Sequence, residues 1–273
     1  MSAPTDSNKD ASGAHRKNLA VRGSVTLVGA GPGDPELLTL KAVSAIGRAT
    51  VLLVDDLVSD AVLAFAAPEA RIVHVGKRGG CASTPQAFID KLMAAEAVKG
   101  ENVVRLKGGD PFIFGRGGEE AERLRGQGIA VEIVNGITAG LAAASALGVP
   151  LTHREHAHGV ILVTAHARTD GAPLDWHTLA AAAAQGLTLV VYMGVSAIEA
   201  LQSGLLHGLP PVTPAAVVQH VSLPQQRQLL CTLGTLAASV RAEGLGSPAI
   251  VIVGDVLRGM QTLSQTGVAE RVA

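Results

Sequence analysis

The sequence predicts an α/β fold made of two α/β domains, with a ligand cleft between them. Short runs of Val, Leu, Ile and Ala alternate with segments of helical character, which is typical of strands joined by helices. The alternation starts a second time near residue 159, which indicates two units. The chain has 273 residues and is 48% hydrophobic but only 2% aromatic, so both cores should consist of aliphatic side chains.

The first half contains strand-like runs that we expect to form one mostly parallel sheet. They span residues 24–29, 50–56, 70–76, 102–106 and 130–134. We expect helices over 35–47, over 84–97 with Thr84 as N-cap and Pro85 as the first helical residue, over 119–125, and over 135–147. Strands that alternate with helices pair in parallel, because each crossover returns the chain to the same end of the sheet.

The second half repeats this pattern with one difference. Its apolar runs lie at 159–164, 187–193, 215–219, 228–232 and 248–253, and an Ala-rich helix is expected at 179–184. The short connection at 223–226 favours a hairpin, so we expect a mixed sheet. We therefore divide the chain into a disordered tail (1–21), an N-terminal domain (22–152), a C-terminal domain (153–260) and a flexible tail (261–273).

Charge and hydropathy exclude several classes of function. A formal net charge of −1 argues against a general binder of nucleic acid or anionic membrane. No apolar run approaches the ~20 residues that a membrane span needs, and residues 1–21 lack the apolar centre of a signal peptide. Cys81 and Cys231 show no metal-ligand or redox spacing, so we expect two thiols in a reducing cytoplasm.

A glycine-rich loop between residues 105 and 120 is the densest concentration of candidate binding groups. It reads Arg-Leu-Lys-Gly-Gly-Asp-Pro-Phe-Ile-Phe-Gly-Arg-Gly-Gly-Glu-Glu and joins a predicted strand to a predicted helix. Glycine lets a backbone approach a ligand closely, and open α/β sheets bind small molecules at the carboxyl ends of their strands. Since Asp110 supplies an acceptor and Arg116 a donor, we interpret this stretch as a binding loop rather than a turn shaped by packing alone.

A second glycine-rich loop follows the first strand, at residues 29–35. Its Gly-Ala-Gly-Pro-Gly-Asp-Pro is similar to a dinucleotide fingerprint, but Asp34 replaces the third glycine and Pro32 interrupts the pattern. No Lys-Ser or Lys-Thr pair follows, so the loop is not a triphosphate cradle.

These loops belong to a set of motifs that resembles the uroporphyrinogen-III C-methyltransferases of the tetrapyrrole methylase family. The motifs occur in order at 28–35, 75–78, 105–120, 151–154 and 247–250, within a likeness that covers about residues 24–258. The resemblance implies methylation of uroporphyrinogen III at C2 and C7 to give precorrin-2. It also implies S-adenosyl-L-methionine (SAM) as methyl donor in the interdomain cleft, S-adenosyl-L-homocysteine (SAH) as product, and a homodimer. Siroheme, cobalamin and haem d1 pathways are all compatible with it.

The resemblance also assigns residues to the SAM pocket. They are Pro32, Gly108, Gly109, Asp110, Ile113, Thr138, Ala139, Met193 and Ala249. Their types suit the role, since glycines allow backbone approach, Asp110 offers a polar anchor and Thr138 starts a helix. By its residue type alone Met193 is better explained as a core side chain, and only the resemblance places it at the cofactor or the substrate.

The proposed acceptor carries many carboxylates, which arginine pairs bidentately. We choose Arg116 and Arg154 first and then Arg78 and Lys77, although a single arginine is more often a surface charge. Methylation also releases a proton from the macrocycle. The candidates for handling it are Asp55, Lys77, Arg116, Glu119 and His166. The resemblance suggests Asp55 and Lys77 as an acid/base pair, whereas Arg116 is a poor base and should act electrostatically.

No metal site is expected from the histidines of the second half. His153, His156, His158 and His166 lie close in sequence but lack cysteine partners or helical His-Glu-x-x-His spacing. Two other functions remain open: a methyltransferase that acts later on the corrin ring, and a non-catalytic nucleotide-binding module. Turnover with SAM and uroporphyrinogen III separates them from the main hypothesis.

The sequence departs from the family pattern at a few positions. Val54 replaces a tyrosine, Asn135 a proline, Ala165 a glycine, and Val221-Ser222 a Gly-Thr pair. None of these changes removes a charged group that we assign to catalysis. The last one alters the cofactor contacts expected from the second half.

Overall fold

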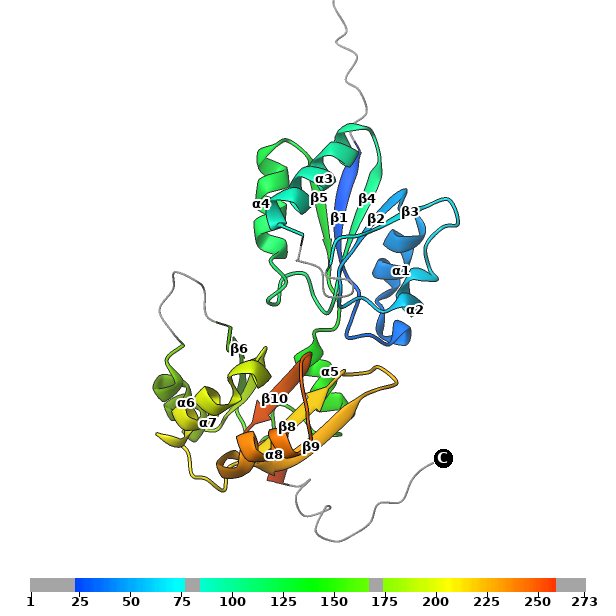
Figure 1. The fold of residues 1–273 in the computed structure, drawn as a ribbon. Helices are drawn as coiled ribbons and strands as arrows, with labels where there is room; N and C mark the ends of the chain where they lie inside the picture. Colours follow the sequence, from blue (N-terminus) through cyan, green and yellow to red (C-terminus); the bar gives the residue numbers. More distant parts are fainter. Residues whose placement is uncertain (1–22, 77–83, 167–173, 259–273) are drawn as a thin grey trace, which may run out of the picture.

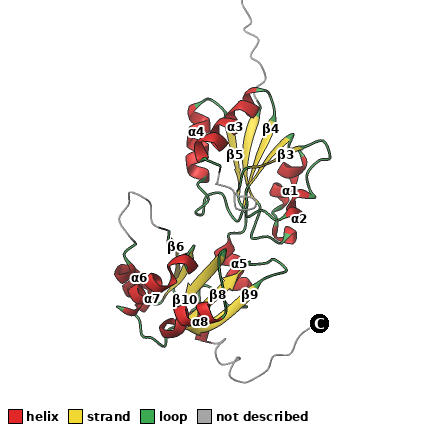
Figure 2. Ribbon diagram, viewed as in Figure 1, coloured by secondary structure: helices red, strands yellow, loops and turns green. Residues whose placement is uncertain are grey.

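The computed structural model describes residues 23–76, 84–166 and 174–258, which form two five-stranded sheets (Figures 1 and 2). The expected tails at 1–21 and 261–273 lie outside the described residues, as do Lys77 and Arg78. The prediction of two α/β units with one parallel and one mixed sheet is confirmed.

The first sheet is entirely parallel and has the strand order β3-β2-β4-β1-β5. Its strands are β1 (Ser24–Gly29), β2 (Val51–Val54), β3 (Arg71–His74), β4 (Asn102–Lys107) and β5 (Ala130–Val134). Buried residues from β1, β2 and β4 dominate both faces, as expected for a parallel sheet covered on two sides. The chain order reverses beside β1 and β4, so the loops that follow these strands border a crevice.

Helices cover both faces of this sheet. They are α1 (Leu40–Gly47), α2 (Asp60–Leu63), α3 (Gln86–Val98) and α4 (Gly117–Gly126). Ile46 of α1 and Val62 of α2 pack with Val28 on one face. Met93 of α3 and Leu124 of α4 pack with Leu27 on the other. The loops at the carboxyl ends of the strands remain between these layers and the second half.

The second sheet has the order β6-β7-β10-β8-β9, with β6 parallel to β7 and antiparallel pairing in the rest. Its strands are β6 (Gly159–Thr164), β7 (Leu187–Tyr192), β8 (Pro214–Gln219), β9 (Arg227–Thr232) and β10 (Ala249–Val253). The helices α6 (Trp176–Ala184), α7 (Ile198–Leu206) and α8 (Leu236–Ala242) pack on one face of it. Short 3-10 turns at Val195–Ala197, Leu233–Thr235 and Asp255–Leu257 complete the half.

The helix α5 (Ala139–Ala146) lies on the opposite face of the second sheet, although it follows β5 of the first sheet in sequence. Ala143 and Leu147 pack there against Val190 and Ile252. The division of the chain after residue 152 stays a prediction. By packing, however, α5 already belongs to the second half, and the chain crosses between the sheets at residues 135–138.

Five predicted helix starts were wrong. The helices α4 and α6 begin earlier than expected, at Gly117 and Trp176, because Arg116 and the side chain of Asp175 cap them there. The helix expected over 35–47 is a 3-10 turn (Pro35–Leu37) followed by α1, because Leu38 and Thr39 are extended and the Thr39 hydroxyl accepts from the Ala42 N–H to start a new helix. The helix α3 begins at Gln86 with Pro85 as N-cap, one residue later than expected. The helix α5 begins after Thr138 rather than at 135, because residues 135–138 are used for the crossing.

Within the described ranges, none of the helices has the length and apolar character needed to cross a membrane.

Candidate ligand site between the two sheets

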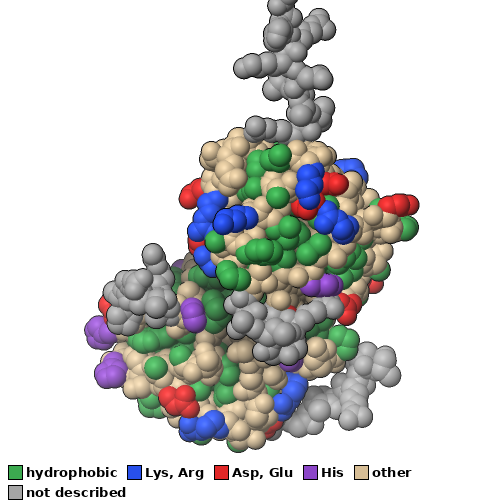
Figure 3. Space-filling view, turned by 45° about the horizontal axis from the view of Figure 1, so that its top comes forward, with side chains coloured by type: hydrophobic (Ala, Val, Ile, Leu, Met, Phe, Trp, Pro, Cys, Tyr) green, Lys and Arg blue, Asp and Glu red, His purple; other side chains and the backbone are tan. Residues whose placement is uncertain are grey.

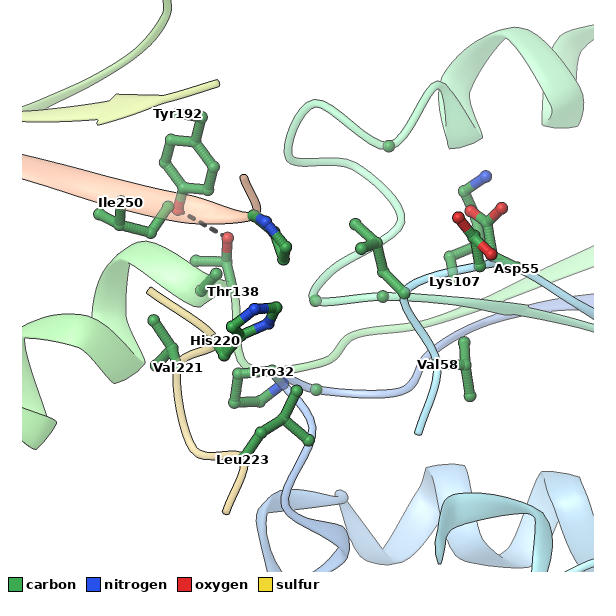
Figure 4. Close-up of a pocket in the computed structure, with 18 of the residues that line it drawn as sticks. Pro32, Asp55, Val58, Lys107, Thr138, Tyr192, His220, Val221, Leu223 and Ile250 are labelled. Carbon is green, nitrogen blue, oxygen red and sulfur yellow. Dashed lines mark hydrogen bonds between the residues drawn. The ribbon is translucent and has the colours of Figure 1, made fainter. Parts of the chain in front are cut away.

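A cavity of about 1110 Å³ lies between the two sheets. The first sheet contributes the loops that follow β1, β2 and β4, and the second half contributes the start of α5, the end of β7 and the segments after β8 and before β10 (Figure 4). Ligand pockets in proteins are usually about 300–1,000 Å³. The space is therefore large enough for a nucleoside-sized ligand and part of a second molecule.

The floor of the cavity is built from two glycine loops that pair with each other. The N–H of Gly109 donates to the carbonyl of Gly31 (2.7 Å) and the N–H of Gly31 donates to the carbonyl of Gly109 (3.2 Å). Both residues have positive φ, which glycine adopts without strain. A Cβ on Gly136 would lie 2.2 Å from the Gly109 carbonyl oxygen, so the crossing after β5 packs directly on this pair.

Asp110 connects the glycine-rich loop at 105–120, here called the central loop, to the crossing between the sheets at 135–138. One carboxylate oxygen accepts from the N–H of Phe112 (2.8 Å), and the other accepts from the Asn135 amide and the Gly136 N–H (both 3.1 Å). The side chain of Asn135, where the family pattern has proline, thus makes a contact that proline cannot make. The buried Asp110 carboxylate fixes the shape of the floor in addition to bordering the cavity.

Tyr192 joins the second sheet to the start of α5. Its hydroxyl lies 2.7 Å from the Thr138 hydroxyl and accepts from the Gly140 N–H at 2.9 Å (Figure 4). Burial raises the pKa of Tyr192, so the phenol stays neutral and keeps its proton for these contacts. Its ring also contacts Phe114 of the central loop, with 4.8 Å between ring centroids.

All the residues that the resemblance assigned to SAM border this one cavity. They are Pro32, Gly108, Gly109, Asp110, Ile113, Thr138, Ala139, Met193 and Ala249. Met193 is 43% exposed and has positive φ, so its position at the cavity wall, rather than in the core, agrees with the resemblance. Their roles in binding stay predictions.

The charged groups at the wall come from the first half. Asp55 follows β2 and Lys107 ends β4, and both border the cavity (Figure 4). Burial lowers the pKa of Lys107, and the neighbouring Arg105 lowers it further, whereas Glu120 and Asp55 oppose the shift. The Lys107 ammonium lies 3.2 Å from the Glu120 carboxylate.

Arg116 and Glu119 lie outside the cavity lining and pair with each other. The guanidinium donates to both carboxylate oxygens, at 2.8 and 3.2 Å, and both side chains are about half exposed. This hydrogen bonding raises the pKa of Arg116. Arg116 has a φ of 59° and caps α4, so its backbone is held in a left-handed turn.

Two further predicted site residues belong to the part of the chain that the structure describes but not to the cavity wall. Arg154 and His166 are exposed and do not line the cavity. His153, Glu155 and His156 are also exposed, and their potential ligand atoms lie within 4.8 Å of one another. The rings of His153 and His156 stack, with 4.6 Å between their centroids.

Sequence reasoning missed several residues of the cavity. Lys107 and Tyr192 are the last residues of β4 and β7, within one residue of the ends of the predicted strands, which is a positional signal that could have identified them. His220 and Leu223 lie in the connection between β8 and β9, and His220 faces the cavity between Pro32 and Thr138 (Figure 4). No local sequence pattern marks His220 or Leu223, because their place at the cavity depends on how the two halves meet. The Ser222 hydroxyl also accepts from the Asp34 N–H (3.0 Å).

The fold combines a parallel sheet and a mixed sheet, and the cavity between them has paired glycine loops at its base. This arrangement is that of an α/β protein that binds a small molecule between two halves. The sequence model of the tetrapyrrole (corrin/porphyrin) methylase family matches residues 24–237 of this chain. The chain therefore belongs to the tetrapyrrole methylase family.

Individual relatives agree with this assignment. A uroporphyrinogen-III C-methyltransferase from Pseudomonas aeruginosa is 56% identical over 86% of this chain and 95% of its own length. A siroheme synthase from Edwardsiella ictaluri is 50% identical, but the match covers only 50% of that longer protein. A crystal structure of uroporphyrin-III C-methyltransferase from Thermus thermophilus with S-adenosyl homocysteine superimposes with a TM-score of 0.73, at 42% identity over 87% of this chain and 100% of that chain.

Proposed function

We propose that this protein transfers methyl groups from SAM to C2 and C7 of uroporphyrinogen III and so produces precorrin-2. The observation that carries the proposal is the convergence of the expected SAM residues, spread from Pro32 to Ala249 in sequence, on one cavity. The 56% identical relative supports the choice of acceptor.

The residues of the cavity fit a nucleoside with a charged tail. The Gly31–Gly109 pair leaves no side chain on the floor, and Asp110 and Thr138 place polar atoms beside apolar Ile113 and Ala249. Bound SAM supplies an activated methyl group on a sulfonium. The protein needs to hold the methyl group in line with the acceptor carbon at near-attack distance, which rigid loops on two sheets can do.

Asp55 is our candidate for the proton that the macrocycle loses. It borders the cavity, and its side chain is 34% exposed, so it can reach a ligand. One of its carboxylate oxygens lies 3.5 Å from the Arg105 guanidinium, which restrains the side chain. Lys77, the partner that the resemblance suggests, lies outside the described residues. Glu119 and His166 stay secondary candidates, since neither borders the cavity.

The carboxylates of the acceptor need placed cations rather than a basic surface. On the face drawn in Figure 3, basic side chains are interspersed with acidic and neutral ones. Arg116 and Arg154 are both exposed, and Arg116 is paired with the equally exposed Glu119, so a ligand carboxylate that extends out of the cavity can compete for its guanidinium. Arg78 would add a further charge from the undescribed segment after β3.

We extend the proposal to assembly and location. A homodimer is implied by the resemblance, and exposed apolar side chains such as Leu40 (90%) and Val212 (68%) offer apolar surface for a subunit contact. Light scattering after size exclusion should give twice the chain mass of 27.7 kDa. Cytoplasmic location is proposed because the widely spaced cysteines suit a reducing compartment.

The decisive experiment incubates the purified protein with SAM and uroporphyrinogen III without oxygen and follows products by mass spectrometry. Two added methyl groups per macrocycle and two SAH per precorrin-2 are expected. SAH binding without any turnover would instead identify a non-catalytic module, and turnover only on already methylated corrin precursors would identify a later enzyme of the series.

A further inference from the structure

A cluster of buried charges lies behind the cavity wall, under Asp55. Arg105, Lys107 and Glu120 are 2%, 3% and 0% exposed. One oxygen of Glu120 lies 3.5 Å from the Arg105 Nε, 3.2 Å from the Lys107 Nζ and 2.8 Å from the Gln86 amide nitrogen. Of these side chains only Lys107 borders the cavity. Charges this deep are expensive to keep unless their partners are fixed.

Strand geometry explains how the cluster forms. Side chains alternate along β4, so Val103, Arg105 and Lys107 project to the face that α3 and α4 cover. Arg105 pairs with Leu53 across the β2–β4 ladder, and Asp55 lies two residues further along that chain. Glu120, in the first turn of α4, approaches from above this face.

Arg105 is held from several directions. Its Nη1 donates to the carbonyls of Leu106 (3.1 Å) and Leu53 (3.4 Å), and its Nη2 lies 3.5 Å from a carboxylate oxygen of Asp55. The guanidinium therefore spans from Glu120, inside the protein, to Asp55 at the wall. A planar group with this many fixed contacts cannot follow Asp55 if that side chain turns away.

The charge balance of the cluster also indicates that Asp55 belongs to it. Arg105 and Lys107 bring two positive charges and Glu120 only one negative charge, and the second oxygen of Glu120 has no hydrogen-bond partner among the described residues. The carboxylate of Asp55 supplies the missing negative charge. With the Asp55 carboxylate 3.5 Å from the Arg105 Nη2, the cluster holds two cationic and two anionic side chains.

We propose that Arg105 is a positioning residue for Asp55, held in place by Glu120 and Lys107, so that the wall of the cavity presents a carboxylate of fixed direction. The inference rests on the proposed function, in which Asp55 handles the proton of the macrocycle. Arg105 acts through Asp55 and touches neither substrate nor cofactor.

The test is a double-mutant cycle on the full-length protein, with Asp55→Asn, Arg105→Met and the combined variant. We expect Asp55→Asn and Arg105→Met each to lower kcat by at least about tenfold, with SAH affinity in calorimetry kept within about twofold. Because Arg105 acts through Asp55, the combined variant should be no slower than Asp55→Asn alone. Losses that multiply in the combined variant would overturn the proposal.

Two further variants keep the test valid if Arg105→Met folds poorly. Glu120→Gln should lower kcat in the parent but not in the Asp55→Asn background, and Arg105→Lys should recover part of the loss. Glu96→Gln is the matched control, because Glu96 is also a buried carboxylate with two cationic partners, Arg71 and Lys99, but lies away from the cavity. It should change stability without changing kcat.

The outcomes also separate this inference from the proposed function. If the parent protein forms precorrin-2 but Asp55→Asn does so at the parent rate, the positioning role is wrong while the methyl transfer stands. If the parent protein forms no methylated product from uroporphyrinogen III, the proposed function itself fails.

Discussion

The hydroxyl groups of Thr138 and Tyr192 lie 2.7 Å apart and join the start of α5 to the end of β7. Thr138 is the last residue of the crossing between the sheets, and Tyr192 belongs to the second sheet. This contact therefore orients the crossing relative to the second sheet at the edge of the cavity. A defect here should affect both stability and ligand binding.

Tyr192→Phe should destabilise the protein while keeping the aromatic contact with Phe114. The change leaves the buried Gly140 N–H without its acceptor, which costs about 1–3 kcal/mol. At about 2–4 °C per kcal/mol for a chain of this size, thermal unfolding should shift by several degrees. The control is Thr188→Val in the same strand, because the buried Thr188 hydroxyl has no hydrogen-bond partner among the described residues and its loss should be neutral or stabilising.

Asp110→Ala should weaken SAH binding by roughly 1–3 kcal/mol, the scale of a lost charge-assisted contact. The physical reason is that the loop after β4 and the crossing after β5 lose their shared acceptor. Calorimetry measures the change. Asp175→Ala, which removes a carboxylate that caps α6 away from the cavity, should bind SAH like the parent. Equal affinities for both variants would remove Asp110 from the binding site.

Arg116→Leu should lose most turnover while SAH affinity survives, because Arg116 lies beyond the part of the loop that lines the cavity. Arg116→Lys keeps the charge but not the planar fork that pairs with carboxylates, so it should already be impaired. Arg241→Leu breaks a comparable surface pair with Glu199 and serves as the control. A variant that forms precorrin-2 at the parent rate contradicts the assignment, and the SAH measurement shows whether the loop has kept its fold.

Cys231 should react slowly with alkylating reagents in the folded protein. Burial raises the pKa of its thiol to about 11, so the thiolate fraction at pH 8 is lower than in the unfolded chain by about a hundredfold. A Cys81→Ser background isolates the Cys231 signal. Rapid alkylation under native conditions would show that this partly buried thiol is more accessible than the structure indicates.

The same shift makes stability depend on pH. Because the pKa is raised in the folded state, the contribution of the neutral thiol is fully present below pH 9 and is lost as the pH rises toward about 11. Tyr192, whose pKa is also raised by burial, adds a loss in the same direction. The unfolding midpoint should therefore fall above pH 9 less steeply in Cys231→Ala than in the parent.

Much of the fold could be predicted because strands that are buried along their whole length carry a strong local signal. Val51–Val54 and Ala249–Val253 are continuous apolar runs bounded by charge or proline, and both became central strands. Helix starts were less predictable. Whether Thr39 or Pro35 begins a helix depends on one side-chain hydrogen bond, which composition does not reveal.

The candidate site also has a part that could be predicted from the sequence and a part that could not. Gly109 and Asp110 stand in a motif whose composition already indicates ligand binding. The cluster beneath Asp55 was missed, because Arg105 and Lys107 look like ordinary solvent-exposed cations until α4 is placed over them. Only alternation along β4, with Val103 on the same face, hints that both are buried.

Among the described residues, the chain passes from one sheet to the other once, between β5 and α5. That passage is also the place where Gly136 touches the paired glycine loops and where Thr138 borders the cavity. A ligand in the cavity therefore lies against the segment that joins the two halves. Entry of the methyl donor and departure of a bulky product should therefore depend on the angle between the two halves. Each bound ligand should shift the population toward the angle at which it binds more tightly, by its difference in binding free energy between the two arrangements.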